Sequence, residues 1–380
     1  MDRRFRYVTG QGNSFEEQLK DLFFAYKPHG TPVRLVIFGN PADNAEYLAH
    51  LDIIGKYMPE IFGNNLPVFS YVAQAPLEHN HIEMETFEIG PGSGCQFYYR
   101  SRGDIPYLVL ETSETRELYL GGVKSGVAAS GIGDQADIIF SRILEIFNLE
   151  KMPVSSIVRQ WNYIEGITMT DGGRQHYQEF NDARSRFYNT VRWENSYPAA
   201  TGIGTSCGGV IVDVDAIMNT GCKMKVAALN NSLQVPAHAY SQVVLYGAED
   251  RSCNEKSTPK FERAKVIFNE TGLHIYISGT AAIRGEKSLN ETSAGEQTLI
   301  TLENIEHLIS PSSLTVTGEE ITDHARICSL RVYLKDECDF AQCREIISNR
   351  YPGIPAVYLK ADICRDELLV EIEGFSYVRK

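Results

Sequence analysis

Apolar and polar residues alternate strictly in two runs near the end of the chain. The apolar side chains of these runs are Val357, Leu359, Ala361 and Ile363, then Leu368, Val370 and Ile372. A period of two is typical of β-strands. Only a short stretch around Arg365 separates the runs, so the pattern predicts an antiparallel hairpin. If its apolar side chains share one face, the other face carries Cys364 together with Glu371 and Glu373.

That polar face has two explanations. Antiparallel sheets often leave one face in water, and the polar residues are then only a solvated surface. Alternatively, this face serves a chemical function, because it carries the carboxylates, the thiol and Lys360. At about 3.3 Å per residue, these groups lie within about 7 to 13 Å of one another along the strands.

The rest of the chain predicts strands and helices in an order that occurs twice. Residues 32–73 read as strand, helix and strand. Three strands in 95–121 are followed by a helix at 134–149, a strand at 154–164, a helix at 173–191 and strands at 209–217 and 224–229. The order then recurs as strands at 265–269 and 273–279, a helix at 294–309, a strand at 327–334, a helix at 339–350 and the hairpin.

This order predicts an α+β fold of two tandem units, each a mixed sheet with helices packed on one face. We expect an N-terminal β-α-β extension at 1–90, a first unit with its connector at 91–254, and a second unit at 255–380. The polar segment 231–259, which is rich in residues that break helices and strands, is expected to connect the units. A pocket between the units is the natural place for a site.

Composition narrows the classes of function. The 380 residues carry a net charge of −13 with scattered basic residues, which argues against nucleic-acid binding. No signal peptide and no membrane-spanning run is seen, so we expect a cytoplasmic protein. The eight cysteines lack C-x-x-C spacing and are read as reduced thiols. His79 and His81 have no acidic or cysteine partner at a ligand spacing, so neither a metal nor another cofactor is expected.

Two sets of motifs resemble known families. From Phe261 onward the chain resembles the reactive-intermediate deaminase (Rid) superfamily through F-E-R-A-K-V-I, L-H-I-Y-I-S-G-T, S-L-R-V-Y-L-K-D and L-L-V-E-I-E-G. Further motifs are R-Q-W-N-Y-I at 159–164, R-Q-H-Y-Q-E-F-N-D-A-R at 174–184, P-A-A-T-G-I-G at 198–204 and Q-V-P-A-H-A-Y at 234–240. Together they resemble the chorismatases, relatives of the Rid superfamily that are also labelled pteridine-dependent deoxygenase-like. The resemblance covers about residues 150–380 and implies two tandem Rid-like, chorismate-mutase-like units.

The resemblance implies cleavage of the enolpyruvyl ether of chorismate. The products would be pyruvate and either 3-hydroxybenzoate or a dihydroxycyclohexadiene carboxylate. Glu371 matches the acid of the family, and burial or a neighbouring carboxylate such as Glu373 would have to keep it protonated near neutral pH. Cys364 matches a position whose residue type separates the two products, and a cysteine resembles the hydroxybenzoate-forming kind.

Other positions are candidates for substrate binding. Arg184 and Arg263 are expected to bind the two carboxylates, because a guanidinium group pairs with a carboxylate through two hydrogen bonds. An exposed helix arginine is the alternative for Arg184, and a buried strand aromatic is the commoner explanation for Tyr163. Small residues let the backbone approach a ligand, offer N–H donors or leave room for its ring. These further candidates are Thr201, Gly202, Gly279 and Ala281.

The sequence also departs from both families. Deaminating Rid proteins carry an arginine where this chain has Val357, which makes imine deamination doubtful. The loop at 284–292 lacks a histidine that the resemblance leads us to expect. A non-catalytic small-molecule-binding protein and an imine or enamine deaminase therefore remain alternatives. The expected partner is a small anionic, chorismate-like molecule, with no nucleic acid or membrane, and the assembly is a monomer or a trimer.

Overall fold

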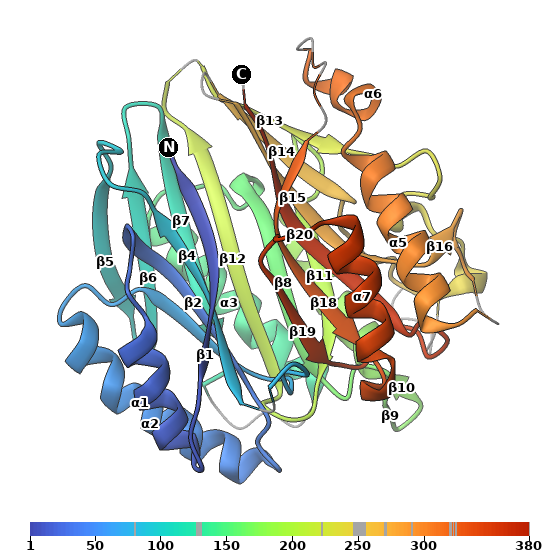
Figure 1. Cartoon of the computed structure of the whole chain (residues 1–380). Helices are drawn as coiled ribbons and strands as arrows, with labels where there is room; N and C mark the ends of the chain where they lie inside the picture. The colour runs from blue at the N-terminus through green and yellow to red at the C-terminus, as the bar shows by residue number, and fades with distance from the viewer. Residues whose placement is uncertain are drawn as a thin grey trace.

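The computed structural model describes residues 1–79, 81–126, 131–221, 223–245, 256–269, 272–289, 292–318, 321, 323 and 325–379. Its strands form three larger sheets whose inner faces meet, with helices on the outside (Figure 1). No helix in these ranges combines the length and apolar character needed to cross a membrane.

The middle sheet contains the first predicted unit. Its strands lie in the order β11-β8-β12-β7-β6-β5. Their bounds are β5 (Gln96–Arg102), β6 (Ile105–Glu111), β7 (Thr115–Val123), β8 (Ile157–Glu165), β11 (Ala199–Thr205) and β12 (Val210–Asn219). The helices α3 (Ile132–Leu149) and α4 (His176–Tyr188) share one hydrophobic cluster with the apolar side chains of one face. The predicted helices are confirmed, whereas the strand β11 was not predicted.

The C-terminal sheet repeats this arrangement strand for strand. Its order is β13-β14-β15-β20-β18-β19. The bounds are β13 (Lys225–Leu229), β14 (Ala264–Asn269), β15 (Gly272–Ala281), β18 (Arg326–Leu334), β19 (Ala356–Lys360) and β20 (Val370–Arg379). The helices α5 (Ala294–Leu308) and α7 (Phe340–Arg350) cover one face. In both sheets the outermost pair, β8 with β11 and β18 with β19, is parallel, while the other pairs are antiparallel. The predicted α+β fold with tandem units is confirmed.

The N-terminal sheet has part of the same strand arrangement. Its order is β1-β4-β2-β3, with β2 parallel to β3 and β4 antiparallel to both of its neighbours. The elements are β1 (Arg3–Gly10), α1 (Phe15–Ala25), β2 (Thr31–Gly39), α2 (Asn44–Phe62), β3 (Val68–Ala73) and β4 (Ile82–Ile89). The predicted strand, helix and strand are β2, α2 and β3, and the sheet adds β1, α1 and β4. Shorter elements are β9 (Thr170–Asp171), β10 (Arg174–Gln175), β16 (Ile283–Arg284), β17 (Lys287–Ser288) and α6 (Pro311–Leu314).

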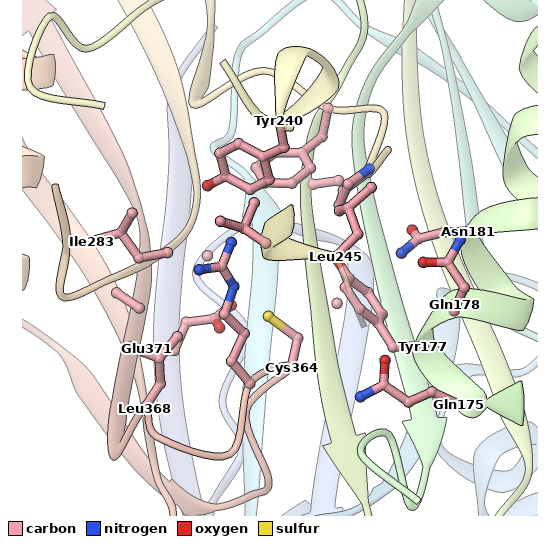
Figure 2. Close-up of a pocket in the computed structure, with 18 of the residues that line it drawn as sticks. Gln175, Tyr177, Gln178, Asn181, Tyr240, Leu245, Ile283, Cys364, Leu368 and Glu371 are labelled. Atoms are coloured by element: carbon pink, nitrogen blue, oxygen red, sulfur yellow. The ribbon is translucent and has the colours of Figure 1, made fainter. Parts of the chain in front are cut away.

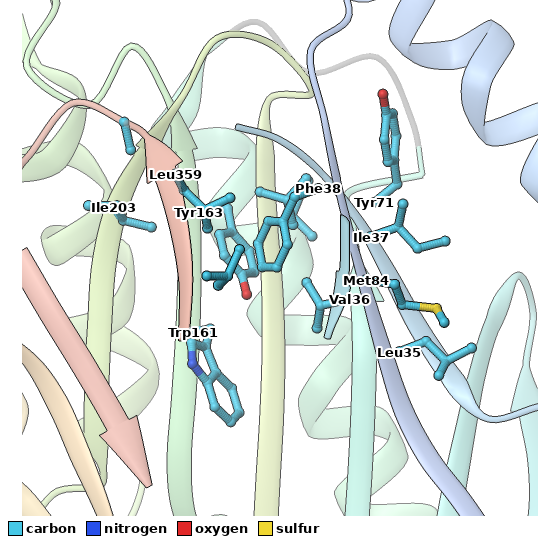
Figure 3. Close-up of a cluster of buried hydrophobic side chains, with 14 of the residues drawn as sticks. Leu35, Val36, Ile37, Phe38, Tyr71, Met84, Trp161, Tyr163, Ile203 and Leu359 are labelled. Atoms are coloured by element: carbon cyan, nitrogen blue, oxygen red, sulfur yellow. The ribbon is translucent and has the colours of Figure 1, made fainter. Parts of the chain in front are cut away.

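One hydrophobic cluster joins all three sheets. Figure 3 shows Val36 and Phe38 of β2 facing Trp161 and Tyr163 of β8, with Leu359 of β19 beside them. Because this cluster crosses every predicted domain boundary, the division at residues 90 and 254 stays a prediction.

Six charged side chains are buried at the centre, where the three sheets meet. Each ion pair joins an arginine of one sheet to a carboxylate of the next. The pairs are Arg34 with Asp215, Arg159 with Glu373 at 2.6 Å, and Arg331 with Glu85 at 2.6 Å. The Trp161 ring lies 4.1 to 5.5 Å from the three guanidinium groups. We call these six residues the central ion-pair cluster; it ties the three sheets together.

The predicted terminal hairpin is wrong. β19 pairs with β18 and β20 pairs with β15 and β18, so β18 separates the two runs. Val357 packs in the cluster between the sheets, whereas Ile372 packs under the helices. The period-two pattern identified both strands but could not identify their partners, because pairing depends on the path of the whole sheet. The solvated-face explanation is also wrong for Glu371 and Glu373, which are both buried.

Candidate functional site

A cavity lies between the middle and C-terminal sheets, with about 700 Å³ of unfilled space when its opening to solvent is included. Its wall comes from the start of α4, from β11 and β15, from the loop between β19 and β20, and from residues 240–245 and 259–263. Figure 2 shows Glu371 and Cys364 on one side of this space, Tyr177 and the amide side chains of Gln175 and Gln178 on another, and Tyr240 above. The tandem arrangement therefore places this cavity between two units, where the sequence predicts a pocket.

Glu371 reaches this cavity from β20. Burial and, after it, the neighbouring carboxylate of Glu373 raise the pKa of its carboxyl group to about 8, against the opposing effects of Arg159 and Arg263. In the described part of the chain, no protein group forms a hydrogen bond with the Glu371 carboxyl group. The side chain is thus a protonated acid at neutral pH that faces the cavity.

Gly279 on β15 makes room for this acid. A Cβ atom at position 279 would overlap Oε1 of Glu371. Its N–H donates to Oγ1 of Thr201 at 2.9 Å, which fixes the backbone at this point. The position of the Glu371 carboxyl group therefore depends on the absence of a side chain at residue 279.

Cys364 lies on the loop between β19 and β20 and also lines the cavity. The loop is fixed against β11, because the N–H of Gly204 donates to the carbonyl oxygen of Asp362 at 2.8 Å. Burial, followed by the nearby Glu371, raises the pKa of the thiol to about 12. The group is a neutral S–H and not a thiolate nucleophile.

Two guanidinium groups line the same cavity. Arg263 donates from Nη2 to Oη of Tyr240 at 2.6 Å and to the carbonyl oxygen of Val235 at 2.9 Å, while its buried Nε has no hydrogen-bond partner among the residues that the structure describes. Arg365 donates from Nη1 to Oγ of Ser288 at 3.0 Å. Both guanidinium groups lie near the Tyr240 ring, at 5.6 and 5.2 Å from its centre. Two cations that line one cavity match a ligand with two carboxylates.

Arg365 was not among the predicted site residues. It follows Cys364 directly, and that adjacency was the available signal, but the hairpin prediction gave it only the role of a turn. Tyr177, Gln178 and Asn181 lie in a motif that carried the resemblance, yet only Arg184 of that motif was selected. Side chains at the beginning of α4 line the cavity because the helix starts at its rim.

Three other predicted residues, Gly202, Gly279 and Ala281, line the cavity. The Tyr177 ring lies against Gly202, where a Cβ would come within 2.8 Å of the ring. Small residues here let an aromatic ring and the Glu371 carboxyl group approach the strands. Their contacts with a ligand stay a prediction.

Three predicted residues lie outside the described lining of the cavity. Arg184 is buried rather than exposed and donates from Nη2 to Oδ1 of Asn181 at 2.6 Å, so it adjoins a lining residue. Tyr163 is buried in the central core and accepts a hydrogen bond from Nη1 of Arg331 at 2.8 Å. Thr201 lies behind the wall, and its Oγ1 accepts from Nη2 of Arg159 at 2.6 Å. Direct substrate contacts by these three residues remain predictions.

Val357, at the position of the deaminase arginine, is buried in the hydrophobic cluster between the sheets. Across the described ranges, no three His, Cys, Asp or Glu side chains are grouped so that they could hold a metal ion. Of the H-N-H motif, Asn80 lies outside the described residues.

The middle of the chain matches a known family model. The model is described as Chorismatase FkbO/Hyg5-like, N-terminal, and it matches residues 98–216. A 3-hydroxybenzoate synthase from Streptomyces hygroscopicus is 32% identical over 235 residues, which are 60% of this chain and 65% of the relative. The match thus spans just under two thirds of that relative. A chorismatase from the same organism is 27% identical over 263 residues, 68% of this chain and 72% of the relative.

The fold matches as well. A crystal structure of a chorismatase aligns with a TM-score of 0.70 at 20% identity, over 99% of this chain and 98% of that one. The alignment therefore includes the N-terminal sheet, which lies outside the family model. The family model, the curated relatives and the shared fold agree, so the chain is similar to chorismatases in sequence and in fold, as its motifs predicted.

Proposed function

We propose that the protein cleaves the enolpyruvyl ether of chorismate and releases pyruvate, with Glu371 as the general acid. One observation carries the proposal: a buried carboxylic acid whose pKa is raised to about 8 faces a cavity that also presents Arg263 and Arg365. The similarity to curated chorismatases and to a 3-hydroxybenzoate synthase supports the same substrate. No cofactor is required for this chemistry.

The reaction begins with a proton transfer. Glu371 delivers its proton to the methylene carbon of the enol ether, and the positive charge that results is shared between the adjacent carbon and the ether oxygen. Water then adds to that carbon and the adduct collapses to pyruvate and the cyclohexadiene diol. When the oxygen of the neighbouring ring hydroxyl instead displaces the ether oxygen, which leaves with pyruvate, and the ring then aromatises with loss of a proton, no water is consumed overall and the products are pyruvate and 3-hydroxybenzoate.

Arg263 and Arg365 neutralise the two carboxylates of the substrate. The overall charge of the protein is −13, so a dianion needs cations gathered locally. Guanidinium groups donate strong, charge-assisted hydrogen bonds to carboxylates, and the Nε of Arg263, which has no partner among the described residues, is available for one. With the carboxylates held, the methylene carbon can lie against Glu371.

The decisive experiment measures pyruvate release from chorismate, coupled to lactate dehydrogenase. Pyruvate formation at a rate proportional to enzyme concentration supports the proposal. Ammonia release from an imino acid without pyruvate formation would instead identify a deaminase. Binding of chorismate without turnover would identify a non-catalytic binding protein.

Replacing Gly279 by alanine is expected to lower turnover by about 10- to 100-fold, because the new Cβ displaces the Glu371 carboxyl group. The flexible end of Glu371 can swing away, so the fold should persist, which circular dichroism checks. Gly55→Ala on α2 is the matched control, since a Cβ there meets no atom within 4 Å. Full turnover in Gly279→Ala would mean that the observed position of Glu371 is not the reactive one.

Replacing Cys364 by alanine tests the product. We propose that the neutral thiol beside Glu371 favours 3-hydroxybenzoate, so the variant should shift the product ratio toward the diol. After complete conversion, chromatography separates the aromatic product from the cyclohexadiene diol and measures this ratio. An unchanged ratio would mean that the thiol does not influence which product forms.

A further inference from the structure

A second carboxylate lies directly behind the acid. Glu373 follows Glu371 by two residues on β20, so their Cα atoms are about 7 Å apart on one face of the strand. Glu371 lines the main cavity, whereas Glu373 lines a separate central cavity of about 300 Å³. The two carboxyl groups are therefore neighbours in different compartments, and only the first faces the proposed substrate.

Glu373 is fixed from several sides. Its oxygens accept hydrogen bonds from Nη2 of Arg159 at 2.6 Å, from Nε1 of Trp161 at 2.9 Å and from the hydroxyl of Thr201. Nη1 of Arg331 lies 3.2 Å away. Two guanidinium groups and two further donors hold the buried Glu373 carboxyl group in one orientation.

Thr201 and Gly279 form the partition between the two compartments. The Thr201 hydroxyl donates to Glu373, and its oxygen accepts from the N–H of Gly279. The Glu371 carboxyl group lies against Gly279 on the other side. A continuous set of contacts thus runs from the fixed carboxylate through Thr201 and Gly279 to the acid.

Charged and titratable groups surround Glu371 from every element that packs against it. Glu373 shares its strand, and Tyr333 of β18 lies opposite in the sheet. The remaining groups are Arg159 of β8, Arg263 next to β14, Cys364 and Arg365 of the adjoining loop, and Tyr177 of α4. After burial, Glu373 is the group that raises the pKa of Glu371, while Arg159 and Arg263 lower it.

We infer that Glu373 is a positioning residue for the acid: the fixed carboxylate keeps Glu371 in its proton-carrying form, and Thr201 ties the two together through Gly279. The inference rests on the proposed function, because it concerns the acid of that reaction. Glu373 itself touches no substrate, since the partition separates it from the main cavity.

Infrared titration tests the charge effect without any substrate. The C=O stretch of the protonated Glu371 carboxyl group is assigned by its loss in Glu371→Gln, and its midpoint in the unaltered protein is expected at about pH 8. In Glu373→Gln the midpoint should fall by at least about one pH unit, because one negative charge disappears and Arg159 is no longer neutralised. The pH above which the rate of pyruvate release declines should fall by the same amount.

Asp215→Asn is the matched control. Asp215 occupies the corresponding place on β12, is equally buried and pairs with Arg34 in the central ion-pair cluster, but it does not line the main cavity. Its replacement removes one buried carboxylate from the same cluster and should leave the Glu371 midpoint unchanged. An unchanged midpoint in Glu373→Gln, or an equal shift in Asp215→Asn, would overturn the inference.

Thr201→Val tests the tie through Gly279, and it also serves if Glu373→Gln fails to fold. The expected result is a kcat at least about tenfold lower with KM within about twofold, because the acid loses its fixed position while the lining of the cavity is kept. Thr201→Ser retains the hydroxyl and should restore most of the turnover. A raised KM with unchanged kcat would contradict the positioning role. Absence of turnover in the unaltered protein would refute the proposed function, and the infrared titration would still decide the role of Glu373.

Discussion

Replacing Glu371 by glutamine is expected to reduce pyruvate release from chorismate by at least about two orders of magnitude, because glutamine keeps the size of the side chain but has no acidic proton to deliver. Chorismate binding should persist, since Arg263 and Arg365 remain in place. The measurement is the steady-state rate at saturating chorismate near pH 7, where the acid of the unaltered protein is protonated because its pKa is about 8. As pH rises through that value the rate should fall.

Glu83→Gln provides a close control for this substitution. Glu83 on β4 is also a buried carboxyl group with a pKa raised to about 8, mainly by burial. It stands opposite Phe38 of β2 as Glu371 stands opposite Tyr333 of β18, but it does not line the cavity. Glu83→Gln should retain normal turnover. Full turnover in Glu371→Gln would exclude Glu371 as the acid, and an equal loss in both variants would point to a general effect on folding.

Replacing Arg331 by methionine is expected to lower the free energy of unfolding by about 3 to 5 kcal/mol, because it leaves Glu85 charged, buried and without its main partner. Arg331 donates to both oxygens of Glu85, at 2.7 and 2.6 Å, and also to Tyr163. It thereby connects the C-terminal sheet to both other sheets. Urea denaturation followed by tryptophan fluorescence measures the change, since the Trp161 ring lies 5.5 Å from the Arg331 guanidinium group.

Arg102→Met is the control, because it removes an arginine from a solvent-exposed ion pair. The Arg102 and Glu145 side chains are about half exposed, so water already solvates both charges. Its denaturation midpoint should stay close to that of the unaltered protein. A similarly small change in Arg331→Met would mean that the central ion-pair cluster contributes no stability beyond that of surface pairs.

The repeated topology brings acids to equivalent places. Glu83, Asp213 and Glu371 stand on corresponding strands, opposite Phe38, Trp161 and Tyr333. The pKa of each carboxyl group is raised, with burial as the largest cause. Asp213 is occupied by hydrogen bonds from Ser70 and Gly122, whereas Glu371 lines the cavity. The repeat therefore supplies three buried acids, of which the cavity exposes one to the proposed substrate.

Much of the site could be predicted from short motifs, because residues close in sequence on one strand or loop stay close in space. Cys364, Glu371, Gly279, Ala281, Gly202 and Arg263 all line the cavity as expected. Arg184, Tyr163 and Thr201 do not. Each belongs to a strand or helix with two sides, and a motif does not say which side faces a ligand. Arg365 was missed because its role depends on how its loop folds over β16 and β17.

The sequence by itself determined the class of fold, most helices and strands, the alternation that marks Glu371 and Glu373 as one strand face, and the resemblance to the chorismatases. These properties follow from local periodicity and from motifs that a few neighbouring residues carry. Only the tertiary structure decided that β18 separates β19 from β20 and that ion pairs between sheets fill the centre. Strand partners and buried charge pairs join residues up to 246 positions apart, and the packing of whole sheets, rather than any local pattern, selects them.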